Sequence, residues 1–75
     1  MKSFALFDRV SVSPRGGWKT ACRGVVVSEP EPVDTVRGPE YFYWVEFDEA
    51  QQTIDGEDTY RKAQILSCYL ESERP

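Results

Sequence analysis

Hydrophobic residues recur at every second position in several short stretches of the chain, which is the period of a β-strand and not of a helix. Phe4, Leu6, Val10 and Val12 share one parity, and Val25-Val26-Val27 forms a β-branched run. We therefore expect strands over residues 4–12, 21–28, 41–48, 59–63 and 68–71. The pattern predicts an all-β domain made of short strands.

Turn-forming residues separate these strands. Pro14-Arg15-Gly16-Gly17 ends the first strand, and Asp55-Gly56 predicts a turn before the fourth. Residues 29–40 contain three prolines, which favour a long exposed loop without ladder hydrogen bonds and make it a candidate contact element. Residues 64–67 fit a single 3₁₀ turn before the last strand, and residues 72–75 fit a frayed tail.

The segment 41–48 is the strongest strand and presents two different faces. Alternation places Tyr43, Val45 and Phe47 toward the interior and turns Phe42 and Trp44 outward. Two exposed aromatic side chains on one face of a small domain need an explanation. Either the loop over residues 29–40 covers them, or they form an interface with a second copy or another protein, unless the strand has a different register.

The chain has 75 residues, enough for one small core, and its 40% hydrophobic and 29% charged residues are typical of a globular domain. Its net charge of −4 is unevenly distributed: residues 1–25 carry five cations and one carboxylate, and residues 26–60 carry one cation and ten carboxylates. This acidic excess disfavours nucleic acid as a partner. The acidic part is either a solvated surface or a contact for a basic partner, which includes the basic start of a second copy.

Cys22 and Cys68 are isolated and lie within apolar segments, so we expect buried free thiols, with a single disulfide between them as the alternative. The chain has no histidine and no CxxC pair, which argues against a zinc site. No apolar run approaches the roughly 18 residues of a membrane span, and the first nine residues carry charge too early for a secretory signal. We expect a cytoplasmic protein with no membrane contact.

Residues suited to catalysis or metal binding are sparse. The carboxylates at residues 48–49 and 55–58 lack the spacing of a calcium-binding loop, and a domain this small has little room for the paired carboxylates of a glycosidase. Arg15-Gly16-Gly17-Trp18-Lys19 combines glycine amides, cations and an aromatic ring, which could hold an anion or stack on single-stranded nucleic acid. We expect no cofactor and no metal ion.

The spaced segments at residues 7–12, 24–27, 44–48 and 65–66 resemble those of the SH3-like small barrels. The likeness extends over residues 4–71 and includes the stromal SH3-like subunit of photosystem I, KOW-type and Tudor-type modules, and the β subunit of nitrile hydratase. It implies a single domain, a five-stranded SH3-like barrel with a 3₁₀ turn before the last strand. Because the residues of these segments are those that pack the core of a barrel, they imply a fold and not a function.

A weaker resemblance connects the chain with the type II dihydrofolate reductases, which are SH3-like homotetramers with a central active-site pore. Asp8-Arg9-Val10 and Trp18 resemble their beginning, and Ala63-Gln64-Ile65-Leu66 resembles their valine-glutamine-isoleucine-tyrosine motif. Leu66 replaces the tyrosine, and Val12 or Ser13 stands where the family has a basic residue. Both departures count against reductase activity, which stays as an alternative.

These observations favour a non-catalytic interaction module or accessory subunit that binds a protein partner or itself. The expected contact residues are Trp18, Phe42, Trp44 and Tyr60. A small core gains stability when an oligomer buries more apolar surface, and a two-fold dimer is the commonest closed form. The alternatives are reductase activity and binding of single-stranded nucleic acid.

Overall fold

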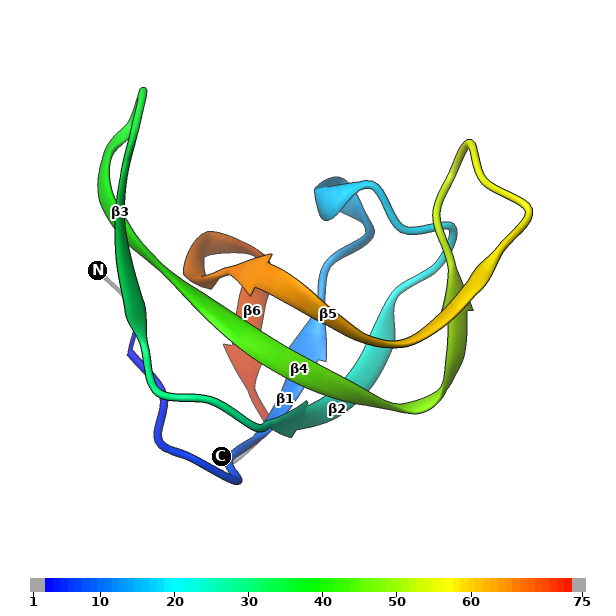
Figure 1. The fold of residues 1–75 in the computed structure, drawn as a ribbon, viewed down its shortest axis with the longest axis horizontal. Helices are drawn as coiled ribbons and strands as arrows, with labels where there is room; N and C mark the ends of the chain where they lie inside the picture. Colours follow the sequence, from blue (N-terminus) through cyan, green and yellow to red (C-terminus); the bar gives the residue numbers. More distant parts are fainter. Residues whose placement is uncertain (1–2, 74–75) are drawn as a thin grey trace.

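The computed structural model describes residues 3–73 and shows one antiparallel sheet that curls into a half-barrel (Figure 1). Its elements, in chain order, are β1 Arg9–Val12, η1 Pro14–Gly16, β2 Cys22–Val26, β3 Glu31–Thr35, β4 Gly38–Gln52, β5 Thr59–Leu66, η2 Ser67–Tyr69 and β6 Leu70–Ser72. The two η elements are 3₁₀ turns, and no α-helix occurs in the described range. The predicted all-β fold with a 3₁₀ turn before the last strand is confirmed.

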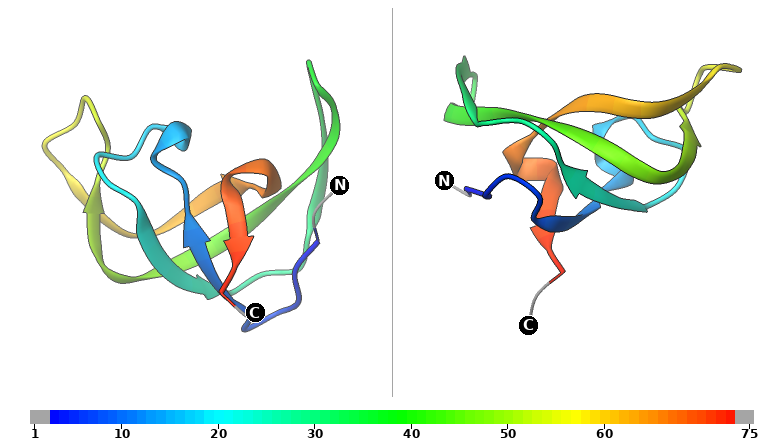
Figure 2. Two further views of the ribbon diagram at one scale, coloured as in Figure 1. Left: turned by 180° about the vertical axis from the view of Figure 1, so that it is seen from behind. Right: turned by 60° about the horizontal axis from the view of Figure 1, so that its bottom comes forward.

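β4 is the central strand of the sheet. Neighbouring strands follow the order β3-β4-β2-β1-β6. β2 and β3 pair with different parts of one edge of β4, and β5 pairs with the other edge. The β4–β5 register shifts between Glu46 and Gln51, and such an irregularity bends a strand and increases its twist. β4 therefore curls around the core, and Figure 2 shows the loop after it at the opposite end of the molecule from the β3–β4 hairpin.

The first strand is shorter than the alternation predicts. Phe7 adopts a left-handed backbone with φ of 71°, and Asp8 Oδ2 accepts a hydrogen bond of 2.9 Å from Ala5 N–H. These two features turn the chain before Arg9, where pairing with Val25 of β2 begins. The prediction of a strand from residue 4 is wrong because a local turn, which alternation cannot detect, precedes the ladder.

A β-hairpin replaces the loop predicted over residues 29–40. β3 pairs with the beginning of β4, although Pro32 and Pro39 both belong to this ladder. Tyr41 donates its N–H to Ser67 Oγ (3.2 Å), away from β3, so Pro32 and Tyr41 form a non-hydrogen-bonded pair. Pro39 lies two residues before Tyr41 on β4, so its pair with β3 is also a non-hydrogen-bonded one. A ladder needs no N–H from proline at such positions, so the predicted absence of pairing is wrong.

The end of the chain is shifted relative to the prediction. β5 continues to Leu66 because β4 supplies the opposite residue, Phe42. The 3₁₀ turn therefore occupies residues 67–69 instead of 64–67, and the last strand, predicted from residue 68, begins at Leu70. Of the predicted frayed tail, Ser72 belongs to β6, while residues 74–75 lie outside the described range.

The core fills the concave side of the sheet. Tyr43, Val45 and Phe47 are buried there, which confirms the predicted inner face of the central strand. The remaining buried hydrophobic residues come from all parts of the chain: Val10, Val12, Trp18, Cys22, Val26, Ile65 and Leu70. Both cysteines are free, as predicted, and Cys22 is buried whereas Cys68 is half-buried.

Candidate interaction surface on the outer face of the sheet

Six side chains project from the convex side of β4 and β5 and define what we call the outer face. Residues directly opposite each other on paired strands share a face. Because Tyr43 and its partner Ile65 are buried, the neighbouring pairs point outward. The outer face consists of Phe42, Trp44, Glu46, Lys62, Gln64 and Leu66.

No described element lies over the outer face. The hairpin over residues 29–40, the one segment expected to cover Phe42 and Trp44, places β3 beside β4 in the same sheet. Figure 1 shows this hairpin projecting beyond the end of the sheet rather than folding across it. Trp44 is 41% exposed and Phe42 is half-buried. The predicted outward orientation of both aromatic side chains is confirmed.

Polar contacts hold Trp44 and its surroundings in place. Lys62 Nζ lies 5.9 Å from the centre of the Trp44 ring, within the range of a cation–π interaction. Trp44 N–H donates to Ser28 Oγ (2.8 Å), and Gln64 Nε2 donates to Glu31 Oε2 (3.0 Å) across the strands. The apolar centre of the outer face therefore has an ordered polar rim, the usual anatomy of a protein interface.

Trp18 does not belong to this surface, contrary to the expectation that it would contact a partner. Its side chain is 7% exposed and packs edge-to-face on Phe47, with ring centres 4.9 Å apart. Gly17, with φ of 100°, turns the chain inward, and the following loop pairs with residues 52–54 at the end of β4. This burial also removes the exposed aromatic on which stacking with single-stranded nucleic acid would depend.

Tyr60 is exposed but lies apart from Trp44. Its ring packs on Trp18 at a centre-to-centre distance of 6.1 Å, at the opposite end of β5 from Leu66. The structure thus brings together two of the four expected contact residues, Phe42 and Trp44. It adds Leu66, whose position opposite Phe42 follows only from the strand register.

An apolar groove of about 170 Å³ adjoins the outer face, between β5 and the two 3₁₀ turns. Its lining residues are Gly16, Trp18, Phe42, Gln64, Ile65, Leu66 and Tyr69. Three of these, Phe42, Gln64 and Leu66, also belong to the outer face. The segment that resembles the reductase motif contributes to both surfaces, although its Ile65 is buried in the core.

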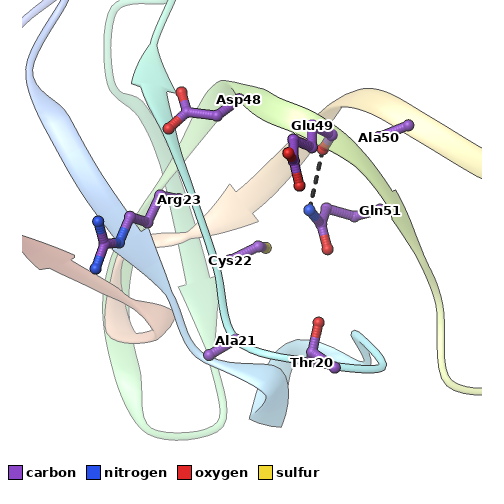
Figure 3. A pocket seen from close by; sticks show the side chains of 8 residues that line it. All are labelled: Thr20, Ala21, Cys22, Arg23, Asp48, Glu49, Ala50 and Gln51. Atoms are coloured by element: carbon purple, nitrogen blue, oxygen red, sulfur yellow. Dashed lines mark hydrogen bonds between the residues drawn. The ribbon is translucent and has the colours of Figure 1, made fainter.

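A second, polar cleft of about 530 Å³ opens where β2 and the bent part of β4 separate (Figure 3). Its lining residues are Thr20, Ala21, Cys22, Arg23, Asp48, Glu49, Ala50 and Gln51. Figure 3 shows Gln51 within the cleft, where its Nε2 donates to the main-chain oxygen of Glu49 (3.0 Å). The cleft thus presents a polar surface with one thiol and no histidine.

Two ionisable groups that line this cleft have shifted pKa values. Arg9 donates two hydrogen bonds to the Asp48 carboxylate, at 2.9 and 2.6 Å, which lower the pKa of Asp48 and raise the pKa of Arg9. Burial raises the pKa of the Cys22 thiol, so it stays protonated near neutral pH. The Cys22 thiol of this cleft is therefore not an activated nucleophile.

Comparisons of the chain with protein-family models, with curated proteins and with solved structures found no match. Within residues 3–73, no group of three or more acidic, cysteine or histidine side chains could hold a metal ion. No helix in this part of the chain is long and apolar enough to cross a membrane. The small all-β half-barrel is compatible with an SH3-like barrel.

Proposed function

We propose that this protein is a non-catalytic interaction module or accessory subunit of the SH3-like barrel type, and that a second copy of the chain is its favoured partner. One observation carries the proposal: Phe42, Trp44 and Leu66 form an apolar strip on a sheet face that no other described element covers. Aromatic side chains dominate the centres of protein interfaces. The two free cysteines suit a reducing compartment, and we propose a cytoplasmic location.

Self-association suits the size and the charge of the domain. A core of this size gives marginal stability, and burying Trp44 in an interface would contribute on the order of 2–3 kcal/mol. The excess of cations in residues 1–25 and of carboxylates in residues 26–60 would orient two copies as they approach. A two-fold arrangement makes the same strip meet itself.

Analytical ultracentrifugation over a concentration series tests the proposal. We expect a dimer below about 100 µM, the range of ordinary weak dimers, and weaker association in Trp44→Ala by a factor of ten or more. Ile54→Ala is the matched control, because Ile54 is also an exposed hydrophobic residue but lies in the loop after β4. A monomer throughout the series, or equal effects of the two substitutions, would contradict self-association through this face.

The enzyme alternative has its own test. A ligand that binds the folded state raises the melting temperature by mass action. We expect neither dihydrofolate nor NADPH to raise it, because Leu66 replaces the tyrosine of the reductase motif and Val12 or Ser13 replaces its basic residue. A concentration-dependent increase with both compounds would instead favour a reductase.

A further inference from the structure

β5 is the one long unprotected edge of the described sheet. β3 and β5 each pair with a neighbour along one edge, and β6 ends the strand order. β6 has only three residues. In β3, the residue at position 32 turns its main chain to the free edge, and because this residue is proline it supplies no N–H donor there. β5 has eight residues and no proline. Its edge can therefore accept another strand more readily than the other two.

The hydrogen bonds of Trp44 show which groups of β5 face this free edge. Trp44 C=O accepts from Val27 N–H (2.8 Å) and Trp44 N–H donates to Ser28 Oγ (2.8 Å), so its main chain points away from β5. Its partner Gln64 is thus in a non-hydrogen-bonded pair and turns its own N–H and C=O to the free edge. Lys62, two residues earlier, does the same. The edge presents two donors and two acceptors in the spacing of a strand.

The apolar groove lies directly beside this edge, since Gln64, Ile65 and Leu66 line it. Alternate side chains of an added strand point to the same side, so one of them would enter the groove between Trp18 and Tyr69. Backbone pairing and an adjacent side-chain pocket are the two components of strand-addition binding.

Charge indicates which strand fits. Arg61 and Lys62 lie on the edge strand, and no ion pair joins either of them to a carboxylate in the described structure. The residues that line the groove include no carboxylate, and the one near it, Glu31, accepts a hydrogen bond from the Gln64 side chain. Two β5 edges paired with each other would gather four cations on one seam, which disfavours a second copy there.

We propose that the free edge of β5 binds an extended segment of another protein as an additional strand. The segment places an apolar side chain in the groove and its carboxylates on the face that carries Lys62. This binding mode goes beyond the self-association proposed above and does not depend on it, because strand pairing uses main-chain groups of β5, although Phe42 and Leu66 belong to both surfaces.

The probes are two labelled synthetic peptides, one of alternating glutamate and valine and one of alternating lysine and valine. Fluorescence anisotropy at low salt should show the acidic peptide binding at least about tenfold more tightly. Amide exchange measured by NMR should slow at Lys62 and Gln64 when the acidic peptide is bound. No binding at about 1 mM, or binding without slower exchange at these two amides, would overturn the proposal.

Two variants and one control complete the test. Gln64→Pro removes a donor that faces the free edge while leaving the bonds between β4 and β5, and it should abolish peptide binding. Arg61→Glu combined with Lys62→Glu should reverse the preference between the two peptides and keeps the test decisive if the proline variant does not fold. Val36→Ala should leave peptide binding unchanged, because Val36 is exposed in the turn between β3 and β4 and lines neither the edge nor the groove. Loss of peptide binding in Val36→Ala would contradict binding at the β5 edge.

Discussion

Gly24 offers a direct test of how closely β2 approaches β4. It lies in the middle of β2, paired with Phe47 of β4 on one side and with Val10 of β1 on the other. A Cβ built at this position would lie 2.8 Å from Val45 Cγ1 and 3.0 Å from the carbonyl carbon of Glu46, and it would overlap the Glu46 carbonyl oxygen. Optimal carbon–carbon contacts are about 3.5–4.0 Å, so Gly24→Ala forces the two strands apart.

The expected destabilisation follows from this overlap. Overpacking a core costs about 1–3 kcal/mol, and the high end applies because main-chain atoms of β4 must move. Replacing glycine by alanine also restricts the unfolded chain, which offsets at most about 1 kcal/mol. We expect a net loss of about 2 kcal/mol from a total stability on the order of 4–11 kcal/mol for a domain of this length. The melting temperature should fall by roughly 8–16 °C.

Urea unfolding followed by tryptophan fluorescence measures this effect, with Gly16→Ala as the matched control. Both substitutions restrict the unfolded chain equally, but a Cβ on Gly16 meets Tyr69 Cδ2 at 3.4 Å, an ordinary contact. The control should change the free energy of unfolding by less than about 0.5 kcal/mol. Equal stability of the two variants would refute the close approach of β2 and β4.

Three further predictions concern charge, thiol reactivity and the β3–β4 hairpin. Because Arg9 lowers the pKa of Asp48, this ion pair stabilises the folded state fully above the ordinary pKa of 3.8, and its contribution is lost as the pH falls through the lowered pKa. Arg9→Gln should remove this acid dependence from melting curves recorded between about pH 2 and 5. Cys22 should react with a thiol reagent much more slowly than the half-buried Cys68 in the native protein and equally fast in denaturant; equal native rates would contradict the burial. The amide of Val33 should exchange its hydrogen more slowly than the amides of the turn at residues 36–37. Equally fast exchange would contradict the pairing of β3 with β4 and favour the loop predicted from the prolines.

The sequence by itself determined the fold class and the inner face of the central strand. Tyr43, Val45 and Phe47 occupy every second position, whereas the other parity includes Glu46 and Asp48, and this spacing holds in any sheet that has one buried side. The outward direction of Phe42 and Trp44 follows from the same alternation. These features could be predicted because each depends on residues that are close neighbours along one strand.

Tertiary structure decided what the local pattern leaves open. Prolines predict a loop when they are considered alone. Pro32 is nevertheless accommodated in β3, because it pairs with β4 at a position where the ladder needs no N–H donor. Trp18 is buried because its loop pairs with residues 52–54, more than thirty positions away. The apolar strip exists because the β4–β5 register sets Leu66 opposite Phe42. Such pairings join segments that are distant in the sequence, and their energies depend on which strands pair. The local spacing of hydrophobic residues does not contain this information.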